Sequence, residues 1–212
     1  MQANEPSYFE QMAATWDVNP VIRSLVEAVV EAILRQVQVT SRMAMLDYGC
    51  GTGLVSFLMA KHVATVTAAD SSEGMLAVLR KKIAAADATT IRAVPLDLER
   101  DSLPDDRYDL IVVNMVMHHV ADTEKMLRNF YSLLRPGGTL CISDLDTEPA
   151  IFHDAQAAPT VRHFGFDREC LLNLLGEIGY LGAQHTTAHV VRKPIASGEE
   201  RDFPIFLLTA RR

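Results

Sequence analysis

The chain has 212 residues, of which 49% are hydrophobic and 22% charged, and its formal net charge is −7 at pH 7. This length and composition are typical of one globular domain with a substantial core, and they exclude an intrinsically disordered chain. The acidic balance disfavours nucleic acid as a partner, because phosphate recognition uses clustered Lys and Arg side chains.

Cysteine usage and the apolar stretches indicate the compartment. Cys50, Cys141 and Cys170 show no CxxC spacing, which argues against a structural zinc and against a disulfide-stapled secreted protein. The N-terminus lacks the basic and then apolar run of a signal peptide. The longest apolar stretches are interrupted well before membrane-spanning length. We therefore expect a cytoplasmic protein with no membrane contact and no metal site.

From the N-terminus onward, the hydrophobic pattern predicts helices that alternate with short apolar strands. Helices are expected over residues 7–16, 21–37, 54–61, 72–85, 123–134 and 167–178. Strands are expected over residues 43–46, 63–69, 90–96, 108–113, 139–143, 180–191 and 203–209. Residues 98–107 and 145–166 contain prolines and are expected to be irregular.

This alternation predicts an α/β fold with a mostly parallel sheet covered on both faces. The last two strands are separated by a loop of about ten residues, too short for a crossover, so we expect an antiparallel hairpin at one edge. In such sheets, ligands bind beyond the carboxyl ends of the strands, where the winding direction reverses. Four of the expected strands end at a polar residue, namely Asp47, Asp70, Asp97 and Asn114.

A glycine-rich turn follows the first expected strand, at Gly49-Cys50-Gly51-Thr52-Gly53. Glycine permits a positive φ and lets a ligand approach the backbone, and the helix that follows favours an anionic group at its N-terminus. A dinucleotide fingerprint would need a third glycine at Leu54, and a Walker loop would need a Gly-Lys-Ser/Thr sequence. Both are missing, which disfavours a nicotinamide-dependent oxidoreductase and a P-loop enzyme.

The segment from Leu46 to Gly53 resembles the first motif of class I S-adenosylmethionine-dependent methyltransferases, which reads hydrophobic, acidic, x, Gly, x, Gly, x, Gly. The resemblance covers most of the chain and implies a doubly wound, Rossmann-like sheet of seven strands. It also implies S-adenosylmethionine as the cofactor and S-adenosylhomocysteine as the product. The cofactor-binding residues that it implies are Asp47, Gly49, Cys50, Gly51, Gly53, Asp70, Ser71, Met75, Asp97, Leu98, Asn114 and Met115.

Within this set, the resemblance implies a role for each strand end. Asp70 would hold the two ribose hydroxyls, since a carboxylate accepts two hydrogen bonds at once. Asp97 and Leu98 would contact the adenine, and Asn114 with Met115 would lie beside the methionine part of the cofactor.

The N-terminal segment resembles the aromatic lead-in of small-molecule methyltransferases, including quinone-biosynthesis enzymes. This resemblance implies a helical lid over residues 1–40 that adds Tyr8 and Trp16 to the cofactor site, although a helix that merely packs on the core remains an equal alternative. A cofactor-binding core over residues 41–146 and a substrate-side region over residues 147–212 would complete one domain, residues 1–212. Five aromatic residues could form a substrate pocket, namely Tyr8, Trp16, Phe152, Phe164 and Phe166.

The expected reaction is transfer of a methyl group to a small-molecule acceptor by in-line displacement. His118 and His119 follow the fourth strand and are candidates for a base or for substrate orientation, because histidine titrates near neutrality. A purely structural role for this pair remains open, and His153 and His163 could line the acceptor cavity. Two alternatives are a non-catalytic cofactor sensor or partner subunit and another reaction of the same cofactor. The sequence leaves open the acceptor, the methylated atom, and whether the protein is a monomer or a homodimer.

Overall fold

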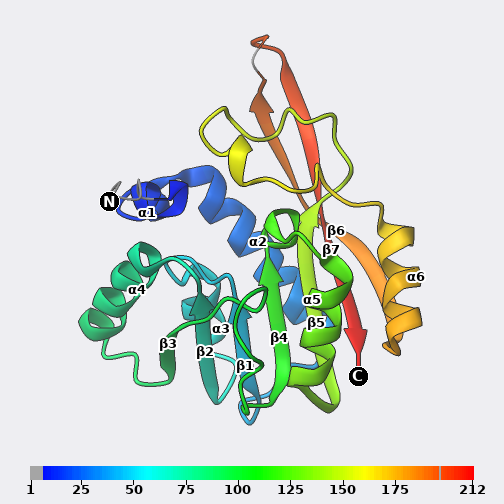
Figure 1. Cartoon of the computed structure of the whole chain (residues 1–212). Coiled ribbons are helices and arrows are strands. Elements are labelled where there is room, and N and C mark those ends of the chain that lie inside the picture. Colours follow the sequence, from blue (N-terminus) through cyan, green and yellow to red (C-terminus); the bar gives the residue numbers. More distant parts are fainter. Residues whose placement is uncertain (1–6, 196) are drawn as a thin grey trace.

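The computed structural model describes residues 7–195 and 197–212, and over these ranges it contains a seven-stranded sheet with the order β3-β2-β1-β4-β5-β7-β6 (Figure 1). The strands are β1 (Ala44–Tyr48), β2 (Thr65–Asp70), β3 (Ile91–Pro95), β4 (Tyr108–Asn114), β5 (Leu134–Leu145), β6 (Leu181–Pro194) and β7 (Glu200–Arg211). β1 to β5 pair in parallel, and β7 is antiparallel to both β5 and β6. The predicted doubly wound sheet with an antiparallel edge hairpin is confirmed.

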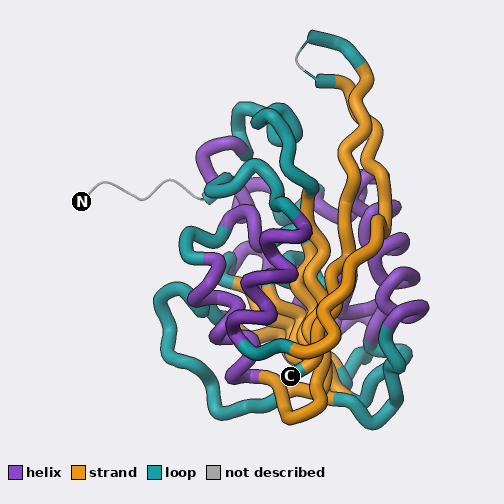
Figure 2. The backbone as a smooth tube through the Cα atoms, turned by 90° about the vertical axis from the view of Figure 1, so that its right-hand side faces the viewer, coloured by secondary structure: helices purple, strands orange, loops and turns teal. Residues whose placement is uncertain are grey.

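Helices cover both faces of the sheet (Figure 2). They are α1 (Tyr8–Met12), α2 (Pro20–Gln36), α3 (Leu54–Met59), α4 (Glu73–Ala86), α5 (Thr123–Leu133) and α6 (Arg168–Ile178), with the 3-10 turns η1 (Trp16–Val18), η2 (Met117–His119) and η3 (Ala158–Thr160). α2, α3 and α4 bury apolar side chains in one core cluster, and α5 and α6 bury theirs in a second cluster on the opposite face. Among the described residues, no helix combines the length and the apolarity needed to cross a membrane.

The helices begin where side chains satisfy their free N–H groups. Asn19 accepts a hydrogen bond from the Val21 N–H, and Pro20 occupies the first position of α2, where no N–H donor is needed. Ser72 caps α4 and Asp167 caps α6 in the same way. These local signals explain why the helix starts agree closely with the sequence-based expectations.

The C-terminal hairpin is longer than expected, and only residues 195–199 separate β6 from β7. Pro204 lies within β7, although proline commonly ends a strand. Its carbonyl accepts a hydrogen bond from the Asp146 N–H, so its own nitrogen also faces the end of β5 and not β6. The pairing of β6 with β7 therefore continues past this proline, and the hairpin projects beyond the rest of the sheet (Figure 1).

The irregular segment that follows β5 folds back beside this hairpin. Asp146 pairs with Phe166 and forms two hydrogen bonds with the Arg168 guanidinium, at 2.6 and 2.7 Å, which brings the two ends of the segment together. The Lys193 ammonium on β6 donates to the Phe152 carbonyl and lies 4.7 Å from the centre of the Phe152 ring. These contacts fix the central part of the segment over the carboxyl ends of the strands.

Candidate functional site

A cavity of about 640 Å³ lies at the carboxyl ends of β1 and β4. These two strands are neighbours in the sheet, and the winding direction reverses between them. The wall of the cavity is formed by the N-terminal segment, the turn after β1, the end of β2, the segment after β4, the irregular segment after β5 and the end of β6. The volume lies within the range of small-molecule and cofactor pockets.

The glycine-rich turn forms one side of this cavity. Gly49, Gly51 and Gly53 all have positive φ angles, of 70°, 54° and 85°. A Cβ atom on Gly49 would lie 2.2 Å from Val116, and one on Gly53 would lie 2.4 Å from Leu79, so these two glycines permit close packing of the protein itself. At Gly51 the nearest atom would be the Trp16 Nε1, 3.8 Å away. Gly51 is therefore the glycine whose missing side chain leaves room for a ligand.

Asp70 connects the glycine turn to the start of α4. Its carboxylate accepts hydrogen bonds from the Gly51 N–H (2.7 Å) and from the Ser72 N–H (2.8 Å). Burial raises the pKa of this carboxyl, although these N–H donors act in the opposite direction. Each oxygen of the Asp70 carboxylate keeps a lone pair. Asp70, Ser71 and Met75 all line the cavity.

Asp47 is a second carboxyl in the wall. It is almost inaccessible to solvent and accepts a hydrogen bond from the Ser56 hydroxyl at 2.5 Å. Burial raises its pKa to about 7, and the nearby charge of Asp70 acts in the same direction. The adjacent Cys50 thiol is also buried, and burial raises its pKa, so this cysteine is not an activated nucleophile.

The N-terminal segment closes one side of the cavity. Tyr8 and Trp16 line it, together with Phe9, which the sequence analysis did not single out. Asp17 holds this segment in place, since its carboxylate accepts hydrogen bonds from the Thr52 hydroxyl and from the Lys82 ammonium (2.6 Å). The segment thus occupies the position expected of a lid.

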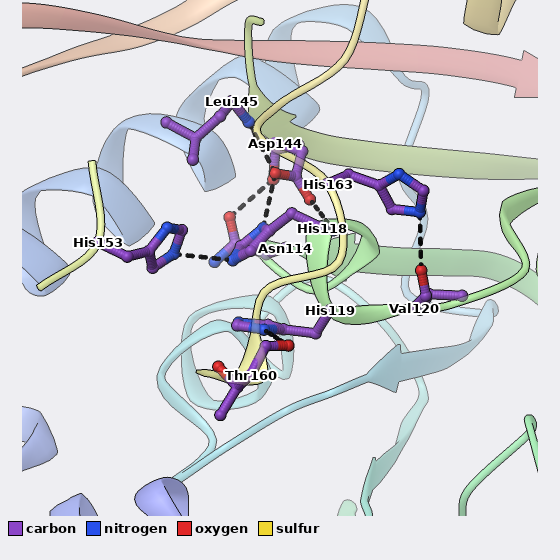
Figure 3. A network of polar contacts seen from close by, with 10 residues as sticks. Asn114, His118, His119, Val120, Asp144, Leu145, His153, Thr160 and His163 are labelled. Carbon is purple, nitrogen blue, oxygen red and sulfur yellow. Dashed lines mark hydrogen bonds and ion pairs between the residues drawn. The ribbon is translucent and has the colours of Figure 1, made fainter. Parts of the chain in front are cut away.

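Three histidines, His118, His119 and His153, gather at the other end of the cavity and are called the histidine cluster below (Figure 3). The buried His118 ring bonds through Nδ1 to the Asp144 carboxylate at 2.8 Å. The Nε2 of His118 lies 3.2 Å from the Nε2 of His153. The Nδ1 of His119 lies 3.0 Å from the carbonyl oxygen of Thr160.

Two of these rings are held in their neutral form. Burial, together with the neighbouring His118, lowers the pKa of His119 and of His153 to about 4. Because the Thr160 carbonyl can only accept a hydrogen bond, the Nδ1 of His119 must carry the hydrogen and its Nε2 keeps a free lone pair.

Three predicted cofactor residues lie outside the wall of the cavity, namely Gly53, Asp97 and Leu98. Asp97 accepts a hydrogen bond from the Glu99 N–H at 3.0 Å and pairs with the exposed Arg100. Leu98 is buried in the core cluster under α5, and its N–H donates to the Tyr48 hydroxyl. The neighbouring Leu96 lines the cavity instead, so the adenine contacts of Asp97 and Leu98 stay a prediction.

The expected aromatic pocket forms only in part. Tyr8, Trp16 and Phe152 line the cavity, but Phe164 is 50% exposed and Phe166 packs against the second core cluster. His163 also turns away, toward the carbonyl oxygen of Val120 (Figure 3). Assigning these three side chains to the pocket was wrong, because the ends of the irregular segment are pinned to β5 and α6 and only its middle reaches the cavity.

The remaining predicted side chains in the wall are Asn114 and Met115. Met115 has a positive φ of 57°, which is uncommon for a residue with a side chain and marks local strain at the end of β4. Lys193 also lines the cavity and was missed, since it lies on the hairpin and no local motif marks it.

The comparisons with known proteins agree with this arrangement. Residues 45–138 match a family model described as a methyltransferase domain. The chain is 36% identical over 102 residues to a ubiquinone biosynthesis O-methyltransferase of Coxiella burnetii, which covers 48% of this chain and 43% of the relative. A solved S-adenosylmethionine-dependent methyltransferase of Mesorhizobium loti has a TM-score of 0.64 and 25% identity, covering 87% of this chain and 98% of that one.

Residues 45–138 therefore form a methyltransferase domain, and the chain is similar to class I S-adenosylmethionine-dependent methyltransferases over most of its length. An uncharacterized methyltransferase of Schizosaccharomyces pombe is 28% identical over 170 residues, covering 74% of this chain and 58% of the relative. The chain spans about half the length of the curated relatives it matches. The cofactor of the family is S-adenosylmethionine, and the residues present fit it, because the open side of Gly51 and the lone pairs of Asp70 face one cavity.

Proposed function

We propose that this protein binds S-adenosylmethionine between the glycine turn and Asp70, and transfers its methyl group to a small-molecule acceptor at the histidine cluster. The observation that carries the proposal is that one cavity reaches from Gly51 and Asp70 to His119 and His153. A cofactor bound at one end would have its reactive methyl group directed toward a second ligand at the other end.

The chain positions the reactants and closes the site. When bound, S-adenosylmethionine supplies an electrophilic methyl group on its sulfonium. In-line transfer needs an acceptor atom held behind that methyl group, and such positioning is worth about 7–11 kcal/mol in favourable cases. Trp16 at the glycine turn and Phe9, which packs edge-on to His119 at 5.2 Å, would exclude water from the space between the reactants.

The histidine cluster would act on the nucleophilic atom of the acceptor. The neutral His119 ring keeps a lone pair on Nε2, and this lone pair can polarise or deprotonate a hydroxyl group. Because Phe152 and Tyr8 line the same cavity, we propose a small apolar or phenolic acceptor. The name of the ubiquinone biosynthesis relative and the negative net charge of this chain also favour such a metabolite over nucleic acid.

The test is a transfer assay with isotopically labelled S-adenosylmethionine and a panel of phenolic and hydroxylated metabolites, read by mass spectrometry. We expect His119→Ala to lower kcat by about 100-fold or more while cofactor affinity stays within about threefold of wild type, since general-base effects are of this size. His185→Ala, which removes a half-buried histidine on β6 remote from the cavity wall, is the matched control. Cofactor binding without methyl transfer to any acceptor class would contradict the proposal.

A further inference from the structure

The histidine cluster has an arrangement that catalysis by a simple base does not require. Candidate ligand nitrogens of His118, His119 and His153 lie within 4.8 Å of one another. Two of them, the Nε2 atoms of His118 and His153, face each other at 3.2 Å. A zinc ion with Zn–N distances of 2.0–2.1 Å places neighbouring tetrahedral ligand nitrogens roughly 3.3 Å apart. This pair therefore already has the separation that a shared metal ion requires.

The far sides of two of the rings, those of His118 and His119, are also arranged as in metal sites. Metal-binding histidines usually donate their second ring N–H to a carboxylate or to a backbone carbonyl, which fixes the ring and its tautomer. His118 has the buried carboxylate of Asp144 at 2.8 Å, and His119 has the Thr160 carbonyl at 3.0 Å. Asp144 is itself held, because it accepts hydrogen bonds from the backbone N–H groups of His118 and Leu145. The Nε2 atoms of His118 and His119 therefore carry lone pairs that can bind an ion, which at His118 would replace the contact with the Nε2 of His153.

We propose that the histidine cluster binds a divalent transition-metal ion of the zinc type, with one coordination position open to the cavity. Imidazole ligands suit zinc and the neighbouring transition metals, and three histidines with an open fourth position form a recurrent catalytic zinc site. The candidate ligand atoms are up to 4.8 Å apart, so His119 would have to move toward the facing pair by up to roughly 1.5 Å to share one ion. The His119 ring lines the open cavity, so it would make this movement by turning about its contact with the Thr160 carbonyl.

The open position would receive an oxygen atom of the methyl acceptor, and this part of the inference rests on the proposed function. The cluster would then fix and polarise a hydroxyl group beside the cofactor through the bound ion. The metal site itself depends only on the histidines and Asp144. Cysteine spacing could not reveal it, since His153 is separated from the other ligands by more than 30 residues and reaches them through the fold of the irregular segment.

The test is metal binding by the full chain, purified without a histidine tag and stripped with a chelator. Titration with Co²⁺ should show one ion per chain with the visible spectrum of a four- or five-coordinate site, and Zn²⁺ should displace it. His153→Phe should weaken Co²⁺ binding by about 100-fold or more, and Asp144→Asn by about 10- to 100-fold through the orientation of His118. His163→Gln removes a nearby imidazole that faces Val120, and it should leave Co²⁺ binding unchanged.

Binding of S-adenosylhomocysteine to each variant, measured by calorimetry, shows that the variant is folded. The same measurement distinguishes a failure of the metal site from a failure of the proposed function. Co²⁺ binding by the wild type that is no tighter than binding by His153→Phe, with cofactor binding retained, would overturn the metal site alone. Equal weakening by His163→Gln would overturn it as well. Absence of cofactor binding in the wild type would overturn the proposed function. The metal site would then be decided by the Co²⁺ titration alone.

Discussion

At the scale of single residues, Asp70 is the side chain on which cofactor binding depends most. It faces the cavity while its oxygens hold the Gly51 and Ser72 N–H groups. Loss of a charge-assisted hydrogen bond costs about 1.5–3 kcal/mol, so Asp70→Ala should weaken S-adenosylmethionine binding by several-fold to a few hundred-fold in calorimetry. Glu73→Ala removes an exposed carboxylate from the same helix start and should bind normally. Unchanged affinity in Asp70→Ala would refute the ribose assignment.

Gly51 gives a second test, with a control of equal backbone strain. Gly51→Val places a branched side chain in the cavity at a φ of 54° and should abolish cofactor binding. Gly137→Val imposes a similar cost at a φ of 80°, in a place where nothing lies within 4 Å of the added Cβ. Both variants should show the circular dichroism of a folded chain. Normal affinity in Gly51→Val would show that the ligand lies elsewhere.

The raised pKa of Asp47 predicts that the protein releases protons when it binds the cofactor. With its pKa raised to about 7, about half of the free protein carries this proton at pH 7. A cationic ligand favours the carboxylate and lowers the pKa, so S-adenosylmethionine should expel protons near pH 7 and expel almost none at pH 9. Calorimetry in buffers of different ionisation enthalpy measures this release. Asp47→Asn should abolish it, and proton uptake by the wild type would contradict the assignment.

At the scale of elements, we propose that the N-terminal segment acts as a lid and that the Asp17 contacts anchor it. Asp17→Asn weakens the ion pair with Lys82. Both side chains of this pair are about one-third exposed, so the loss in the free energy of unfolding should be no more than about 1 kcal/mol. Hydrogen exchange of residues 7–19 should nevertheless become faster, and cofactor affinity should fall by up to about tenfold. Asp106→Asn breaks an exposed pair with Arg92 and should change neither. An unchanged exchange rate in Asp17→Asn would remove the anchoring role.

The elements that local signals define were predictable, and those that tertiary contacts define were not. Asn19 with Pro20 marked the start of α2, and the glycine turn after Asp47 marked the switch point of the sheet. The full length of the hairpin was not visible, because Pro194, Gly198 and the glutamates beside it predicted a longer turn before residue 203.

The cofactor side of the site follows from short motifs, whereas the acceptor side does not. Asp70 and Gly51 belong to segments whose spacing carries information, and both line the cavity. His153 and Lys193 reach the cavity through the fold of an irregular segment and a hairpin, and the neighbouring Phe164 points outward although its sequence context looks equally suitable.

At the scale of the whole molecule, the cavity wall draws on segments from the N-terminal helix to the C-terminal hairpin, so ligand binding should stabilise the entire fold. S-adenosylhomocysteine at about 100 times its Kd should add about 2.7 kcal/mol, which corresponds to a rise in Tm of roughly 5–10 °C for a chain of this size. Differential scanning calorimetry measures the shift. Asp70→Ala should show a smaller one at the same ligand concentration, and no shift in the wild type would contradict this expectation.

The most direct measurement is a crystal structure of the full chain with S-adenosylhomocysteine. The nucleoside should lie beside Asp70 and Gly51, with its sulfur atom directed toward the histidine cluster. Density for the ligand at any other place, or a cavity that stays empty at millimolar ligand, would contradict the account.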